Sequence, residues 1–201
     1  MPMNRAKAFD WYNRAAAKGS AIGYLWLGRY YSHDAGLNEE TKESLSLGSD
    51  NYKKHILSNY WGGVELDYKK ALKCYTMAAE KECEIAECRL GYLYSHGEAF
   101  PSENDSAGGD FIDIEKNLVN AAEWYNRSAK HGYAIAQYRL GYFYLRGLGV
   151  NQDLNESFNW FLKAAQQGHS TSQGWVGYFY EKGIGVHKDI REAIEWYARA
   201  E

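Results

Sequence analysis

The chain has 201 residues, a formal net charge of -3, 45% hydrophobic residues and 16% aromatic residues. This charge, with no run of five like-charged residues, argues against partners that need a concentrated basic patch, so we expect neither nucleic acid nor a membrane surface among its partners. No stretch reaches the roughly eighteen apolar residues of a membrane-spanning helix, and residues 1–20 lack the apolar run of a signal peptide, so we expect a cytoplasmic protein.

The first element predicted along the chain is a helix over about residues 4–18. Asn4 is placed to cap its start, because a short polar side chain there accepts bonds from the first backbone N–H groups. The pair Trp11-Tyr12 lies mid-helix, with alanines at helical spacing on the same face. Gly19 is expected to end the helix in a left-handed conformation. A second helix follows and carries the pair Leu27-Gly28.

Both pairs recur along the chain. The aromatic pair returns as Cys74-Tyr75, Trp124-Tyr125, Trp160-Phe161 and Trp196-Tyr197, with second members 63, 50, 36 and 36 residues apart. The Leu-Gly pair returns as Leu90-Gly91, Leu140-Gly141 and Val176-Gly177, with glycines 63, 50 and 36 residues apart. Because two independent series share the same gaps, the chain contains a 36-residue repeat with insertions of 27 and 14 residues.

The later units repeat the signals of the first. A capping residue stands eight positions before the second member of each aromatic pair, and in two units a glutamate three positions after the cap completes a capping box. The caps are Asp67, Asn117, Asp153 and Asp189, and the glutamates are Glu156 and Glu192. Gly132 and Gly168 end their helices as Gly19 does, whereas Glu82 takes this place in one unit, where the turn should be less favourable. The pattern predicts almost no strand and nine solenoid helices.

The two insertions fall at about residues 34–61 and 97–116. Tyr52, Ile56 and Tyr60 in the first have helical spacing, which predicts a short amphipathic helix. The second is polar and rich in glycine, which predicts a mobile loop. A binding role is open for such loops, but we favour decoration that the solenoid tolerates.

These residues resemble the Sel-1-like repeat, a relative of the tetratricopeptide repeat, whose pattern runs Leu-Gly-x-x-Tyr, Gly-x-Gly-Val, Asp, Ala, Trp-Tyr, Ala-Ala and Gly. The resemblance covers nearly the whole chain outside the insertions. It implies an all-α fold, a right-handed α-α superhelix of about four helix pairs plus an orphan N-terminal helix, and a scaffold or adaptor role. Residues 1–201 then form a single solenoid. Because the last helix repeats the buried pattern, we expect this solenoid to be part of a longer chain or to meet another subunit at its end.

In tetratricopeptide relatives the helix equivalent to the Leu-Gly helix lines the concave face, where partners bind. Transferring its outward positions by spacing gives nine candidate contacts with a partner protein or peptide. They are Leu25, Arg29, Ile85, Cys88, Tyr92, Ile135, Tyr138, Tyr142 and Tyr178. Tyrosines suit a peptide-binding groove, but tyrosines that recur at one repeat position equally well pack between repeats. Arg29 and Tyr138 do not recur, which makes them better candidates for specificity.

We find no catalytic residues, no metal site and no cofactor motif, so we expect neither an enzyme nor a small-molecule substrate. Cys83 and Cys88 lack the second ligand pair of a zinc site. The sequences Gly147-x-Gly149 and Gly183-x-Gly185 lack the third glycine and the preceding strand of a dinucleotide loop, so they are interpreted as repeat connectors.

His33 and His96, like Arg146 and Lys182 at equivalent positions, place a basic residue in the last turn of a helix, where the helix dipole favours it. A structural role therefore explains both histidines. The expected function is a protein–protein interaction scaffold. The alternative is a regulatory or targeting segment of a larger enzyme, for example a kinase, whose catalytic domain lies outside this chain.

Overall fold

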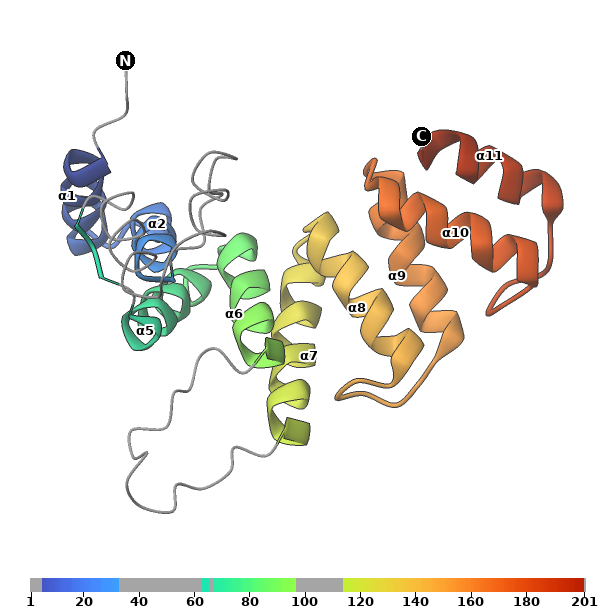
Figure 1. Ribbon diagram of the computed structural model, residues 1–201, viewed down its shortest axis with the longest axis horizontal. Helices are drawn as coiled ribbons and strands as arrows, with labels where there is room; N and C mark the ends of the chain where they lie inside the picture. Colours follow the sequence, from blue (N-terminus) through green and yellow to red (C-terminus); the bar gives the residue numbers. More distant parts are fainter. Residues whose placement is uncertain (1–4, 33–62, 66, 97–113, 201) are drawn as a thin grey trace, which may run out of the picture. The chain divides into compact units, whose positions relative to one another are not determined.

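The computed structural model describes residues 5–32, 63–65, 67–96 and 114–200. Within these ranges it contains nine helices and no strand, as the 36-residue pattern predicts (Figure 1). The helices are α1 (Arg5–Ala17), α2 (Ala21–Ser32), α5 (Tyr68–Ala79), α6 (Glu84–His96), α7 (Ile114–Lys130), α8 (Ala134–Arg146), α9 (Leu154–Gln166), α10 (Ser170–Lys182) and α11 (Ile190–Ala200). None of these described helices is long and apolar enough to cross a bilayer.

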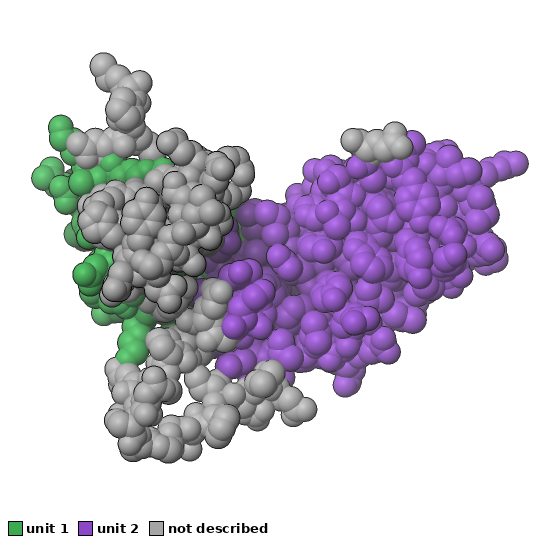
Figure 2. Space-filling view, viewed as in Figure 1, with its two compact units in different colours: residues 1–86 green, residues 87–201 purple. Residues whose placement is uncertain are grey.

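The chain divides into two compact units, residues 1–86 and residues 87–201 (Figure 2). We call α1, α5, α7, α9 and α11 the aromatic helices and α2, α6, α8 and α10 the Leu-Gly helices. In the second unit each helix from α7 to α11 packs against the next one along the chain, which is the neighbour-to-neighbour order of a solenoid. The predicted insertion at residues 34–61 and its short helix lie outside the described residues.

The two sequence series prove to be the two sides of one contact. In every described repeat the glycine of the Leu-Gly pair lies against the second ring of the following aromatic pair. The contacts are Gly28 with Tyr75, Gly91 with Tyr125, Gly141 with Phe161 and Gly177 with Tyr197. A Cβ atom at any of these glycines would fall within 3.0 Å of a ring carbon. The missing side chain therefore lets the ring reach the helix backbone, and this explains why both series share one spacing.

Small residues line the rest of this interface. Those predicted beside the aromatic pair are buried in the later units, among them Ala71, Ala121, Ser157 and Ala193. The Ser157 hydroxyl donates to the Gly141 carbonyl at 2.8 Å, which satisfies a buried polar group within the contact. The repeat position predicts that Trp124 and Trp160 are both buried. This is confirmed for Trp160, whereas Trp124 is partly exposed, and Trp11 at the same position is exposed.

Helix starts agree with the prediction at all three aspartates and differ in one detail. Asp67 accepts the Lys70 N–H, and Asp153 accepts the Asn155 and Glu156 N–H groups. Asp189 accepts the Arg191 and Glu192 N–H groups in the same way. The capping-box prediction was wrong in its second half, because the Asp153 N–H donates to the Tyr144 carbonyl at 3.0 Å rather than to Glu156. Asp67 and Asp189 donate in the same way to Tyr31 and Tyr180, so this bond ties each connector to the helix before it.

One cap was predicted in the wrong place. Helix α7 begins at Ile114, so Asn117 lies inside the helix and the last three residues of the predicted 97–116 insertion are helical. Asparagine often caps helices, but here the residues before Asn117 are helical and extend α7 by about one turn toward its N-terminus. The proposed cap Asn4 and residues 97–113 of the second predicted insertion lie outside the described residues.

The turns between helices follow the predicted glycines. Gly132 and Gly168 have φ of 94° and 85°, a region that favours glycine. Glu82 occupies the same turn with φ of 59°, which makes it the one described non-glycine residue in this conformation and the less favourable turn that the sequence predicts.

Candidate binding surface

The nine predicted contact residues all lie on the Leu-Gly helices, but two of them are buried. Leu25 is 5% exposed and Cys88 is 7% exposed. Cys88 packs with Tyr125 and Leu140 in the core of the second unit. We therefore assign both residues to the interior and define the candidate surface without them.

Two of the predicted tyrosines are partly covered by the next repeat. The Tyr138 ring lies 5.9 Å from Phe161 and is stacked 4.9 Å from the His169 ring, measured between centroids. Tyr142 packs against the same core cluster. Both side chains remain partly exposed. Packing and surface display, which the sequence left as alternatives, are thus combined in these residues.

Two further candidates are held by their own helices. Tyr92 stacks on His96 with ring centroids 4.0 Å apart. The Arg29 guanidinium lies 4.7 Å from the centre of the Trp26 ring. The Nε atom of Arg29 is buried and has no hydrogen-bond partner among the described residues. Each side chain is therefore fixed in direction while part of it stays accessible.

The most open candidates are Ile135 and Tyr178, at 43% and 39% exposure. Tyr178 borders a pocket of about 390 Å³ between α10 and α11, whose walls carry little polar surface. Its lining residues are Thr171, Gly174, Trp175, Tyr178 and Tyr197. We call it the α10–α11 pocket.

Sequence reasoning reached only one of the residues that line this pocket, Tyr178. One feature of the sequence could have indicated the pocket. Gly174 stands at the repeat position that holds Leu25, Cys88 and Tyr138 in the other Leu-Gly helices. No atom lies within 4 Å of the place where its Cβ would be. A side chain is thus missing where three other repeats carry one, and the pocket occupies that space.

The comparisons with known proteins identify the repeat. The family model for the Sel1 repeat matches residues 2–20, 57–83, 85–133, 134–169 and 170–201. The chain belongs to the Sel1 repeat family. A solved Sel1 repeat protein from Oxalobacter formigenes is 27% identical, with a TM-score of 0.71 over 98% of this chain and 63% of that one. A protective antigen of uropathogenic Escherichia coli strains that displays an SLR fold is 29% identical, with a TM-score of 0.70 over 96% of this chain.

This Sel1 repeat chain spans 32% of the length of the Escherichia coli antigen and 63% of the Oxalobacter protein. Together with the family match, the likeness confirms the predicted all-α solenoid of Sel1-like helix pairs. Sel1 repeats generally act as scaffolds for protein interactions.

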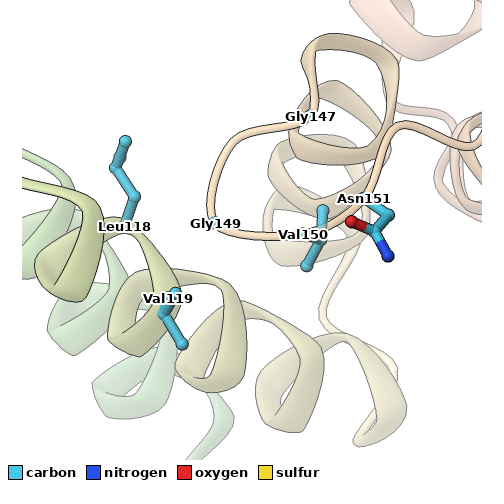
Figure 3. A pocket seen from close by; sticks show the side chains of 6 residues that line it. All are labelled: Leu118, Val119, Gly147, Gly149, Val150 and Asn151. Carbon is cyan, nitrogen blue, oxygen red and sulfur yellow. The ribbon is translucent and has the colours of Figure 1, made fainter.

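A second hollow, of about 560 Å³, lies where the connector after α8 approaches the first turns of α7 (Figure 3). It is lined by Leu118 and Val119 of α7 and by Gly147, Gly149, Val150 and Asn151 of the connector. A Cβ atom at Gly149 would collide with the Leu118 carbonyl oxygen. This is the predicted repeat connector, and the described residues that line the hollow include no ionisable side chain.

A polar cluster around one buried carboxylate lies in the second unit. Glu87 is fully buried, and its oxygens lie 2.5 Å from Arg127 Nε and 2.8 Å from His131 Nδ1. One repeat later the equivalent positions hold Gln137 and Gln167, which are joined by a hydrogen bond of 2.8 Å. The Glu87 cluster thus occupies the place of a neutral contact between repeats. We therefore interpret it as part of the packing between helices and not as a binding site.

Proposed function

We propose that this chain is a protein-binding module that holds an extended segment of another protein along its Leu-Gly helices. The observation that carries the proposal is the α10–α11 pocket. It opens at a predicted contact position, and it is bordered by Trp175, Tyr178 and Tyr197. Large aromatic side chains at such positions dominate the binding energy of many protein interfaces.

The remaining accessible candidates extend this surface within each unit. In the second unit Tyr92, Ile135, Tyr138 and Tyr142 lie on α6 and α8. In the first unit Arg29 lies on α2, and Ile85 lies on the first residues of α6. Each repeat of a solenoid contacts mainly its neighbours, so consecutive helices can read consecutive residues of a bound chain. Since all three cysteines carry free thiols, which fit a reducing compartment, we place this interaction in the cytoplasm.

A photo-crosslinking experiment tests the proposal. The photoreactive amino acid p-benzoylphenylalanine replaces Tyr178 on α10 or, as a control, the exposed Asn159 on the aromatic helix α9. The captured protein is identified by mass spectrometry and then purified for binding measurements. We expect an adduct at position 178 that excess unlabelled chain removes, and a dissociation constant in the micromolar range, about -8 kcal/mol.

The control decides the result. Capture at position 159 with none at position 178 would place the partner on the aromatic helices and contradict the proposal. Capture at position 178 that the unlabelled chain fails to compete would also contradict it, because a specific surface saturates.

A further inference from the structure

Arg139 lies on α8 next to the candidate contact Tyr138, and its positive charge has no partner in the part of the chain that the structure describes. Among the described residues, no carboxylate pairs with it and no acceptor receives a hydrogen bond from its side chain. Its guanidinium carbon lies 5.7 Å from the centre of the Tyr138 ring. The residue is partly exposed, so part of it is accessible to a partner.

Besides burial of its ring, the charge of Arg139 also lowers the pKa of the neighbouring His169. The His169 ring is stacked on the Tyr138 ring, with centroids 4.9 Å apart. The pKa of His169 lies below its ordinary value, first because the ring is partly buried and second because the positive charge of Arg139 acts on it. The positive potential around Tyr138 is therefore not cancelled by a nearby described acid.

None of the described residues that line the α10–α11 pocket is an acid or a base of the Asp, Glu, Lys, Arg or His type. The Glu181 carboxylate on α10 accepts a hydrogen bond from the hydroxyl of the pocket residue Tyr197 at 2.9 Å and pairs with Lys182 at 2.6 Å. A continuous run of rings links the pocket to Arg139. Trp175 stacks on Phe161 at 5.4 Å, and Phe161 lies 5.9 Å from Tyr138.

We propose that the bound segment is acidic, with an apolar side chain in the α10–α11 pocket and a carboxylate of the same segment paired with Arg139. An extended peptide advances about 3.3 Å per residue, so a short segment reaches across two consecutive Leu-Gly helices. A basic segment would instead bring like charge to Arg139, which disfavours binding. This inference rests on the proposed function and names the class of partner.

Selection from a phage-displayed library of random decapeptides on the full 201-residue chain tests it. The tightest selected peptide is then measured by fluorescence polarisation against three variants. Gly174→Leu fills the pocket and, being helical and unobstructed, should leave the fold intact. Arg139→Gln removes the charge, and Arg191→Gln makes the same change on the aromatic helix α11 as a matched control.

We expect the selected peptides to share one large apolar residue and at least one Asp or Glu. Gly174→Leu and Arg139→Gln should each weaken binding about tenfold, and Arg191→Gln should change it less than about twofold. The Arg139 effect should shrink in high salt, because a partly exposed ion pair is screened.

Other outcomes separate the two proposals. Selected peptides that are neutral or basic would overturn this inference, and so would an acidic peptide whose affinity is unchanged by Arg139→Gln. If Gly174→Leu still abolished binding in those cases, the proposed binding surface would stand and only the acidic class of partner would be wrong. A selection that enriches no peptide would overturn both.

Discussion

At the scale of single residues, one glycine and one ring decide how closely two helices approach. Gly141 lies against the fully buried ring of Phe161, and a Cβ there would stand 2.9 Å from a ring carbon. Gly174, on the next Leu-Gly helix, has open space at the same point. Of these two glycines in equivalent helices, Gly141 has no room for a side chain, whereas Gly174 has room that no side chain fills.

This difference predicts opposite effects for the same substitution. Gly174→Ala should stabilise the fold by up to about 1 kcal/mol, because alanine favours a helix and meets nothing. Gly141→Ala should destabilise it by about 1–3 kcal/mol, because the buried ring has no room to move. Urea denaturation of both variants checks this, and equal effects of one sign would contradict the steric account.

The Glu87 cluster makes a second prediction at this scale. Glu87→Ala removes the buried carboxylate that faces Arg127 and His131, and it should cost about 3 kcal/mol. The double variant Glu87→Gln, His131→Gln recreates the Gln137–Gln167 hydrogen bond of the next repeat. It should therefore lie within about 1 kcal/mol of the original chain. A double variant as unstable as Glu87→Ala would show that the charges themselves hold this interface.

The sequence predicted which glycines and rings belong together in register, because both series carry the period. It did not predict which surface residues are open. Leu25, Cys88, Tyr138 and Gly174 share one repeat position, yet two are buried, one is half-buried and one leaves a pocket. Exposure depends on what the neighbouring repeat places opposite, and periodicity alone does not contain that information.

At the scale of helices, capping distinguishes two positions that look alike in the sequence. Asp153 accepts two backbone N–H bonds at the start of α9, whereas Asn117 lies inside α7. Asp153→Ala should cost about 1 kcal/mol. Asn117→Ala should be neutral or slightly stabilising, because alanine has the higher helix propensity. Thermal unfolding of the two variants measures this, and a comparable loss in both would restore Asn117 as a cap.

The helices themselves were predictable because each has a local signal. The orphan helix expected at about residues 4–18 is observed as Arg5–Ala17. The left-handed ends of α8 and α10 fall at Gly147 and Gly183, the first residues of the predicted repeat connectors. The start of α7 was missed because it depends on whether residues before a possible cap continue the helix, and Asn117 alone does not decide that.

At the scale of the molecule, the second unit has its own core. Tyr125, Leu140 and Phe143 fill one cluster, and Phe161 and Phe179 fill the next. A fragment that begins at Glu84, the first residue of α6, and ends at Glu201 should therefore fold by itself. Circular dichroism should show a helical spectrum and a cooperative thermal transition, and a gradual melt would contradict an independent core.

The central claim is that the Leu-Gly helices bind the partner. Hydroxyl-radical footprinting of the complex with the captured partner tests it most directly, because it reports the exposure of native side chains without substitution. Binding should lower the oxidation rate of Tyr178, which is 39% exposed, and leave that of Trp11, which is 66% exposed on an aromatic helix, unchanged. Protection of Trp11 with no change at Tyr178 would contradict the account.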